Sequence, residues 1–139
     1  FARTSNADIY AAGDCASALF NGQRLRIESV GNAIDQADAA ARNMLGKEIA
    51  YQPKPWFWSD QYACKLQIAG LNAGYDRVVV RDDGKARSHW YFAGAQLIAL
   101  DAMNDPRAYM VGKRLIEAGK TVDPALVADA ASDLKAFLQ

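Results

Sequence analysis

The sequence predicts an α+β fold: an antiparallel β-sheet of four to five strands with helices packed on it. Between residues 65 and 103, apolar residues mostly recur at every second position, which is the period of half-buried strands. Asp83-Gly84 lies between two of these runs and favours a hairpin turn. Beyond the last run, Asp105-Pro106 and Asp123-Pro124 each indicate a helix start, with aspartate as the cap and proline at the first helical position.

The composition is that of a globular domain without a strong electrostatic preference. The 139 residues are 51% hydrophobic and 23% charged, and a chain of this length buries about two-thirds of its unfolded surface. Sixteen basic and sixteen acidic residues cancel, so the charge predicts neither nucleic acid nor a membrane surface as a partner. No apolar run approaches the ~18 residues that a membrane-spanning helix requires. We therefore expect a cytoplasmic protein that binds neither nucleic acid nor membrane.

The N-terminal segment predicts a strand that ends at a ligand-binding turn. Residues 9–12 are an apolar run with the length of a buried strand, and Gly13-Asp14 follows, where the chain would turn. A carboxylate at such a strand end faces the crevice in which open α/β sheets bind ligands. Asp14 would accept hydrogen bonds from ligand hydroxyls there, and Gly13 would let a ligand approach the backbone. An ordinary strand followed by a Gly-Asp turn is the alternative.

A chain reversal and a helix follow this turn. Residues 15–20 predict a short helix or loop, Asn21-Gly22 predicts a reversal, and residues 23–28 predict an extended piece. Residues 31–45 carry alanine and other apolar residues at steps of three and four, which predicts a helix that stops at Gly46.

The start of this helix has two interpretations. Backbone N–H groups near Ser29 and Val30 have no partner within a helix, so they can bind an anion or a partly negative ligand edge. Alternatively, the helix is amphipathic and only packs. After it, residues 47–55 include Pro53 and Pro55, which favour an extended linker. We place a domain boundary in this linker.

Three aromatic residues open the second part of the chain. With the period of a strand, Trp56 and Trp58 share one face and Phe57 takes the other. From the residues alone, an aromatic core is the simpler interpretation. The strands that follow form an antiparallel meander and are predicted at residues 66–70, 77–81, 88–92 and 96–103.

The C-terminal part predicts helices that cover this sheet. One helix runs from residue 106 to about residue 118, before Gly119; a short helix starts at Pro124, and a last turn starts at Ser132. Apolar side chains on the first helix would face the sheet: Tyr109, Val111, Leu115 and Ile116.

Three segments of the chain resemble a known family. Thr4-Ser5 with the run Ile9-Tyr10-Ala11-Ala12-Gly13-Asp14 resembles the second flavin-contacting motif of the pyridine nucleotide-disulfide reductase superfamily. The runs at residues 26–33 (R-I-E-S-V-G-N-A) and 55–62 (P-W-F-W-S-D-Q-Y) are similar to those of FAD-dependent NADH:ferredoxin reductases that serve bacterial oxygenases and cytochromes P450. The resemblance covers nearly the whole chain.

This resemblance implies a cofactor, an electron donor and a partner. A hydride would pass from NADH or NADPH to FAD, and electrons would then pass singly to a [2Fe–2S] ferredoxin. By the match of motifs, Gly13 and Asp14 contact FAD, and Ser29 and Val30 face the pyrimidine edge of the flavin. Trp58 matches the tryptophan that lies close to the isoalloxazine ring. No residue is predicted to be a catalytic acid, base or nucleophile, or a metal ligand.

The resemblance also divides the chain. Residues 1–50 would be the C-terminal remnant of an FAD-binding domain, contributing a strand and a helix, and residues 55–139 would be the reductase C-terminal, or interface, domain. The chain has no G-x-G-x-x-G fingerprint, so other parts of a longer parent would hold the nucleotide phosphates. Because the sequence begins within a pattern at Phe1, we expect a fragment that is inactive alone.

Three questions stay open. The chain could chiefly be a dimerisation or interaction module, since related reductases form homodimers through this domain. The parent could resemble apoptosis-inducing factor, in which the core F-W-S-D also occurs, and use an acceptor other than ferredoxin. Lys113, Arg114 and Lys120 form either a solvated face or a basic landing area for an acidic ferredoxin.

The cysteines and the histidine have simple interpretations. Cys15 and Cys64 form no C-x-x-C pair, so buried free thiols are favoured over a disulfide or a metal site. His89 lies in a strand-like run, which indicates a partly exposed strand residue rather than a catalyst.

Overall fold

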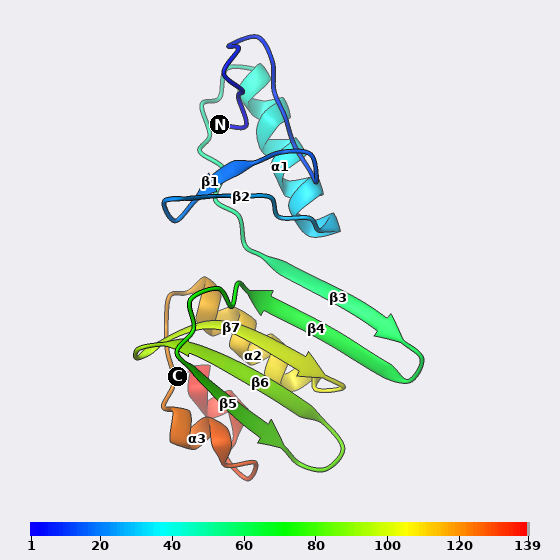
Figure 1. Cartoon of the computed structure of the whole chain (residues 1–139), viewed down its shortest axis with the longest axis vertical. Helices are drawn as coiled ribbons and strands as arrows, with labels where there is room; N and C mark the ends of the chain where they lie inside the picture. Colours follow the sequence, from blue (N-terminus) through cyan, green and yellow to red (C-terminus); the bar gives the residue numbers. More distant parts are fainter. Residues whose placement is uncertain (139) are drawn as a thin grey trace. The chain divides into compact units, whose positions relative to one another are not determined.

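The computed structural model describes residues 1–138. The chain divides into two compact units, Phe1–Pro55 and a second that begins at Trp56. We call these unit 1 and unit 2 and describe each by itself. Figure 1 labels their helices and strands.

Unit 1 contains a hairpin and one long helix (Figure 1). Strands β1 (Ala18–Phe20) and β2 (Gln23–Leu25) pair antiparallel. The turn between them, Asn21-Gly22, has φ values of 49° and 80°, which is the geometry that favours Asn-Gly in two-residue hairpins. Helix α1 (Val30–Met44) begins after Ser29, whose side chain caps its first turn. The predicted reversal and the predicted helix are confirmed.

The prediction of a buried strand at residues 9–12 is wrong. An isolated bridge joins Tyr10 to Arg3, and the Ile9 side chain is 53% exposed. A strand is stabilised by continuous pairing with its neighbours, and the described part of unit 1 gives these residues that single bridge. The strand of this region is β1 instead, where the sequence predicts a loop or a short helix.

Unit 2 contains a five-stranded antiparallel sheet in the order β3-β4-β7-β6-β5. The predicted α+β class and the predicted number of strands are therefore confirmed, as is the hairpin at Asp83-Gly84 between β5 and β6. The strands are β3 (Trp56–Gln61), β4 (Cys64–Gly70), β5 (Arg77–Asp82), β6 (Arg87–Ala93) and β7 (Gln96–Met103).

The order of these strands differs from the predicted meander. Strands β5, β6 and β7 are consecutive neighbours, but β7 also pairs with β4, so the chain crosses to the opposite edge of the sheet between β4 and β5. Gly70 ends β4 at φ +76°, where a Cβ atom would lie 2.1 Å from the carbonyl oxygen of Ile98. Only glycine fits this position, which is where the chain leaves the sheet.

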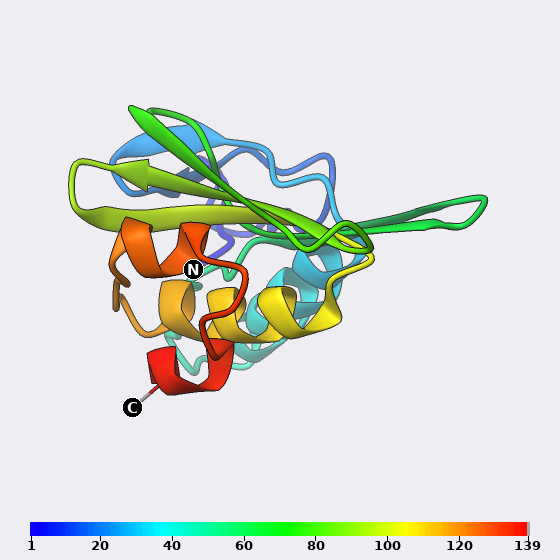
Figure 2. The ribbon, with the colours of Figure 1, turned by 90° about the horizontal axis from the view of Figure 1, so that it is seen from below.

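The helices of unit 2 lie on one face of the sheet (Figure 2). They are α2 (Pro106–Glu117), α3 (Pro124–Ala128) and the 3₁₀ helix η1 (Leu134–Leu138). The side chains of Asp105 and Asp123 accept hydrogen bonds from backbone N–H groups in the first turns of α2 and α3. Both predicted caps are confirmed.

The hydrophobic core of unit 2 lies between these helices and the sheet. Helix α2 approaches closely at Gly112, where a Cβ atom would lie 2.5 Å from Cδ2 of Leu100. The apolar face predicted for α2 is confirmed, because Tyr109 and Val111 are buried and Ile116 packs against the core. The largest fully buried apolar side chains are Trp90, Phe92, Leu97, Leu100, Leu115 and Val127.

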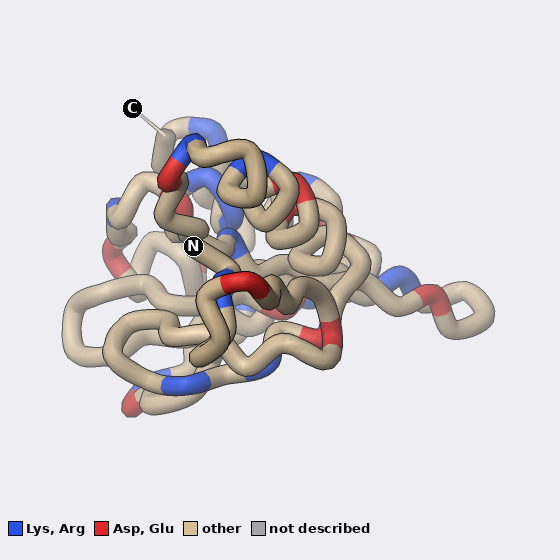
Figure 3. The backbone as a smooth tube through the Cα atoms, turned by 90° about the horizontal axis from the view of Figure 1, so that it is seen from above, with Lys and Arg blue, Asp and Glu red and all other residues tan. Residues whose placement is uncertain are grey.

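Charged residues are spread through both units. Acidic and basic segments are interspersed along the backbone in Figure 3, in keeping with the sixteen residues of each sign. Among the described residues, no helix has the length and apolar character needed to cross a bilayer.

Candidate functional site

The turn at Gly13-Asp14 lies against the first turn of α1. Gly13 is buried at φ +80°, and a Cβ atom added to it would lie 3.5 Å from the Cβ atom of Ala33. Its N–H donates a hydrogen bond to Oε1 of Gln36 at 2.9 Å. The Asp14 side chain is exposed. The structure thus brings together two segments that the sequence separates, and it leaves a carboxylate open to solvent beside them.

The N-terminus of α1 offers free hydrogen-bond donors. Ser29 is buried, and its Oγ accepts a hydrogen bond from the N–H of Asn32 at 3.3 Å. The N–H groups of Val30 and Gly31 have no hydrogen-bond partner among the described residues. The Val30 side chain is 56% exposed. Such N–H groups, at the positive end of a helix dipole, bind anions or carbonyl oxygens.

Trp58 belongs to unit 2 and lies on β3. Its ring stacks on that of Trp56, with centroids 5.4 Å apart and an interplanar angle of 21°. Phe57 points to the other face of the strand, so the predicted alternation is confirmed. Trp58 is 40% exposed, so it is only partly a core residue and keeps an aromatic surface open to contact.

Three amide side chains line the buried face of α1, and sequence reasoning missed their role. Asn32, Gln36 and Asn43 are 8%, 3% and 3% exposed. Each one bonds to backbone outside the helix: Asn32 to Ile27, Gln36 to Gly13, and Asn43 to Phe1 and Ile49. Their spacing of four and seven residues places them on one side of the helix. That spacing was the signal available in the sequence.

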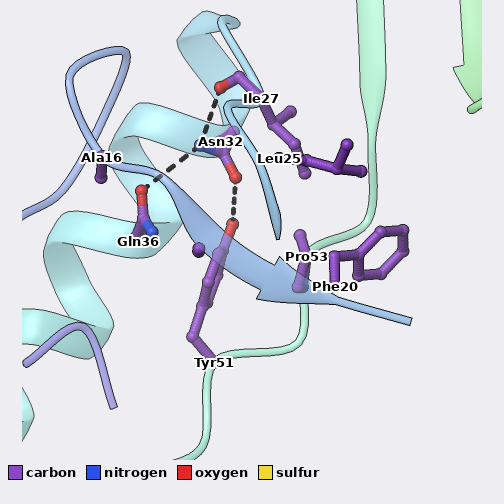
Figure 4. Close-up of a pocket in the computed structure, with 9 residues that line it drawn as sticks. Ala16, Phe20, Leu25, Ile27, Asn32, Gln36, Tyr51 and Pro53 are labelled. Atoms are coloured by element: carbon purple, nitrogen blue, oxygen red, sulfur yellow. Dashed lines mark hydrogen bonds between the residues drawn. The ribbon is translucent and has the colours of Figure 1, made fainter. Parts of the chain in front are cut away.

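Tyr51, in the linker, completes a network around Asn32 (Figure 4). Its hydroxyl donates to Oδ1 of Asn32 at 2.9 Å, while Nδ2 of Asn32 donates to the carbonyl oxygen of Ile27 at 2.9 Å. A longer contact of 3.5 Å joins Nδ2 of Asn32 to Oε1 of Gln36. Burial raises the pKa of Tyr51, and the nearby Asp35 carboxylate adds to this effect. The phenol therefore stays protonated and serves as a donor.

A small cavity borders this network (Figure 4). Its volume is about 10 Å³, close to the lower limit for one water molecule. The side chains of Phe20 and Leu25 line it together with Asn32 and Tyr51. A cavity of this size cannot hold a cofactor.

Unit 2 has a larger open groove beside Trp56. Its volume is about 380 Å³, and α2 supplies the rest of its lining, including Tyr109, Lys113 and Arg114. Lys113 is ion-paired with Glu117 one helical turn further on. This pairing weakens the idea of a basic landing area, because one of its three predicted cations is already neutralised.

The cysteines differ from the prediction in one respect. Cys15 and Cys64 are free thiols, as predicted, but both are exposed rather than buried. Cys15 directly follows Asp14 on an exposed turn, and Cys64 starts β4 beside the β3–β4 turn. His89 is a partly exposed residue of β6, as predicted. Among the described residues, no group of three or more His, Cys, Asp or Glu side chains could hold a metal ion.

The chemistry available at the site of unit 1 is binding. The site offers two backbone N–H donors at the start of α1 that have no partner among the described residues, and one exposed carboxylate acceptor on the Gly13-Asp14 turn that packs on α1. This set fits a ligand that presents a carbonyl or anionic edge together with hydroxyl groups.

Comparison with known proteins places the chain in a family. A family model described as "Reductase C-terminal" matches residues 56–138, which is more than half of the chain. The 5,5'-dehydrodivanillate O-demethylase ferredoxin reductase subunit of Sphingobium sp. is 42% identical over 95% of this chain and 33% of its own length. The ferredoxin–NAD(P)+ reductase of Sphingomonas sp. is also 42% identical, over 98% of this chain and 34% of its own length.

A solved structure agrees with these sequence relatives. The crystal structure of a ferredoxin reductase from Rhodopseudomonas palustris superposes with a TM-score of 0.91 at 38% identity, covering 97% of this chain and 34% of that one. The chain thus spans about a third of the length of the relatives it matches. The family model matches unit 2, and the relatives match nearly the whole chain. The chain therefore belongs to the reductase C-terminal family.

Proposed function

We propose that this chain is part of a flavoprotein reductase that passes electrons from NAD(P)H through FAD to a [2Fe–2S] ferredoxin. The observation that carries the proposal is the Gly13-Asp14 turn, held against the first turn of α1 beside free N–H donors. The names of the two 42% identical relatives, both ferredoxin reductases, support the same activity. FAD, when bound, would accept a hydride and release electrons one at a time.

The residues of unit 1 have distinct roles in this proposal. Asp14 accepts a hydrogen bond from a hydroxyl of the ribityl chain or next to it, and Gly13 leaves room for the cofactor at the backbone. The N–H groups of Val30 and Gly31 donate to the pyrimidine edge of the flavin, while Ser29 shapes this turn by capping it. The positive end of α1 would favour the negative charge that gathers there on reduction, by about 0.3–1 kcal/mol.

Trp58 has the corresponding role in unit 2. We propose that its exposed indole packs on the isoalloxazine ring, excludes water there and shapes the surface from which electrons leave. Its stacking on Trp56 supports this, because the neighbouring ring restricts its rotation. No residue of this chain acts as a proton donor, proton acceptor or nucleophile in the proposal, and the chain alone is expected to be inactive.

We further propose that residues 1–50 are the C-terminal remnant of an FAD-binding domain and residues 55–139 the reductase C-terminal domain. Unit 1 supports this because it buries few apolar side chains of its own. Its buried apolar residues are three alanines, and Val30, Ile34 and Met44 leave an apolar stripe of α1 exposed. Both clusters of buried apolar residues found among the described residues lie in unit 2.

The test is a full-length protein that contains this chain. We expect a flavin absorption spectrum, bleaching of that spectrum by NADH or NADPH, and reduction of a [2Fe–2S] ferredoxin. A full-length protein that binds no flavin would contradict the proposal. Flavin reduction without transfer to any ferredoxin would contradict only the acceptor, and would favour a reductase similar to apoptosis-inducing factor.

The role of Trp58 has a matched control on the same strand. Trp58→Ala should change the flavin spectrum or the rate of electron transfer more than it changes stability. Phe57→Ala removes a ring of similar exposure, 43% against 40%, from the opposite face, so it should leave the flavin unchanged. Equal flavin spectra and rates for both variants and wild type would remove Trp58 from the site.

A second candidate role is an interface. The sheet face opposite the helices exposes Phe57, Val78 and Val80, and an exposed apolar sheet face favours contact with another protein surface. In this alternative the domain forms a homodimer. Sedimentation of the full-length protein tests it: a dimer that Val80→Lys converts to monomer supports the alternative, and a wild-type monomer contradicts it.

A further inference from the structure

We propose that Gln36, Asn32 and Tyr51 are positioning residues of the flavin site. Their hydrogen bonds hold the Gly13-Asp14 turn at a fixed place against the N-terminus of α1, and so set the affinity and the reduction potential of the flavin. The inference rests on the proposed function, and it assigns roles to three residues that touch neither the cofactor nor the partner in that proposal.

We call the hydrogen bonds that join Gly13, Gln36, Asn32, Ile27 and Tyr51 the relay. The direction of each bond in the relay follows from the backbone groups at its ends. The Gly13 N–H can only donate, so Gln36 must turn its oxygen toward it. The Ile27 carbonyl can only accept, so Asn32 must turn its nitrogen there, which also lets that nitrogen reach the oxygen of Gln36. The remaining oxygen of Asn32 then needs a donor, and the Tyr51 hydroxyl supplies it at 2.9 Å. Flipping either amide would break at least one of these bonds.

The relay joins three parts of the chain that are far apart in sequence. Gln36 and Gly13 are 23 residues apart, and Tyr51 and Asn32 are 19 apart. Ile27 lies two residues before Ser29, so its bond to Asn32 fixes the entry of the chain into α1. All the groups proposed to contact the flavin in unit 1 are therefore attached to two buried amides, Asn32 and Gln36, on the first two turns of one helix. Figure 4 shows the hydrogen bonds that join Asn32 to Ile27, Gln36 and Tyr51.

Burial makes this attachment rigid. Gln36 is 3% exposed and Asn32 is 8% exposed, and no buried side-chain nitrogen or oxygen atom of the described residues is without a hydrogen-bond partner. A buried group that loses its partner cannot turn to water instead, so the loss forces a local rearrangement. For Gly13 that rearrangement moves the turn carrying Asp14, and for Asn32 it moves the helix start with the N–H groups of Val30 and Gly31.

A displacement of the start of α1 would change the reduction potential of the bound flavin. The N–H groups favour the reduced cofactor because negative charge gathers at the edge they face, and this effect falls off within the first turn of a helix. A small displacement therefore changes the preference for reduced over oxidised flavin. A purely structural role for the relay would lower stability without changing that preference.

The test uses the full-length flavoprotein and two variants, each with a matched control. Gln36→Met keeps length and volume but removes the acceptor of the Gly13 N–H; Gln52→Met makes the same change at an exposed linker position. Tyr51→Phe removes only the hydroxyl that donates to Asn32; Tyr62→Phe makes the same change at a fully exposed residue. The measurements are the Kd for FAD, the midpoint potential of the bound flavin and the melting temperature.

We expect Gln36→Met to raise the Kd for FAD about tenfold and to lower the midpoint potential. A tenfold loss of preference for reduced flavin corresponds to about 30 mV for a two-electron couple. Tyr51→Phe should shift both quantities in the same direction by less, and it stays informative if Gln36→Met does not fold. The two controls should match wild type.

The outcomes separate this inference from the function on which it rests. A wild-type protein that binds no FAD would overturn both. A flavin-loaded wild type whose two relay variants keep the wild-type potential would overturn the relay alone, whatever their melting temperatures. A lowered potential in the relay variants, with unchanged controls, would support it.

Discussion

Asn43 and Ile49 exchange two hydrogen bonds through the asparagine side chain. Nδ2 of Asn43 donates to the carbonyl oxygen of Ile49 at 2.9 Å, and Oδ1 accepts from the N–H of Ile49 at 2.5 Å. Nδ2 also donates to the carbonyl oxygen of Phe1 at 2.8 Å. One buried amide thus connects the last turn of α1 to the linker and to the first residue of the chain.

Replacing Asn43 with alanine should loosen this junction. The variant leaves the N–H and the carbonyl of Ile49 without their partner, at a cost of about 1–3 kcal/mol. We expect hydrogen exchange at the Ile49 amide to accelerate tenfold or more, since about 1.4 kcal/mol is a factor of ten. Gln52→Ala, at an exposed linker position, should leave that exchange rate unchanged. Equal rates in the two variants would contradict the role of Asn43.

Gly70 and Gly74 provide a matched pair for the end of β4. Their φ values are +76° and +86°, but only at Gly70 would a Cβ atom meet the carbonyl oxygen of Ile98, at 2.1 Å. Gly74→Ala should cost about 1–2 kcal/mol from the left-handed backbone alone. Gly70→Ala should cost at least ~3 kcal/mol, because β7 must also move. Urea denaturation measures both, and equal losses would show that the close approach to Ile98 is unimportant.

Arg81 fastens the C-terminal segment to β5. Nη1 donates to the carbonyl oxygen of Asp129 at 2.6 Å, and Nη2 donates to those of Ala130 and Ser132 at 2.8 and 2.9 Å. Arg81→Lys keeps the charge but loses the planar fork that reaches several carbonyls at once. We expect a loss of about 1–3 kcal/mol, measured by urea denaturation. Arg77→Lys, at an exposed position of the same strand, is the control, and a similar loss there would refute the assignment.

Tyr91 makes the stability of unit 2 sensitive to alkaline pH. Its hydroxyl donates to Oδ2 of Asp101 at 2.7 Å. Burial, together with this hydrogen bond to a carboxylate, raises the pKa of Tyr91 from 10.0 to about 12. Between these pH values the folded state holds the proton more tightly than the unfolded chain does. The resulting stabilisation is fully present below pH 10 and is lost as the pH rises through 12.

The free energy of unfolding should therefore fall more steeply between pH 10 and 12 in wild type than in Tyr91→Phe. The phenylalanine variant has no proton to lose at this position, so the difference between the two slopes isolates Tyr91. Tyr62→Phe, which lies in the turn between β3 and β4 and is fully exposed, should keep the wild-type slope. Urea denaturation at a series of pH values measures all three. Parallel profiles for wild type and Tyr91→Phe would contradict the prediction.

The elements of unit 2 were predictable because their signals are local. Alternation of apolar residues defines β4 to β7, and the caps Asp105 and Asp123 act within one helical turn of themselves. The order of the strands was not predictable in this way. Pairing of β4 with β7 depends on contacts such as Leu66 with Met103, across 37 residues, and a period of two says only which face a residue takes.

In unit 1, less of the structure was predictable from local signals. The turn at Gly13-Asp14 and the helix start near Ser29 were predicted from local residue patterns. Their contact with FAD was implied by the resemblance of their motifs and stays a prediction. The prediction of a strand at residues 9–12 was wrong because an apolar run gives no information about a partner strand. The roles of Gln36 and Tyr51 were missed because each depends on a hydrogen-bond partner that is distant in sequence, Gly13 for Gln36 and Asn32 for Tyr51.

The buried amides of α1 also determine how unit 1 responds to temperature. Exposure of apolar surface raises the heat capacity on unfolding, whereas exposure of polar surface lowers it. Unit 2, with Trp90 and Phe92 in its core, carries most of the positive heat-capacity change. Unit 1, whose buried face consists of amides and alanines, contributes little. Cooling weakens a hydrophobic core, so we expect the free energy of unfolding to curve more strongly with temperature for unit 2 than for unit 1.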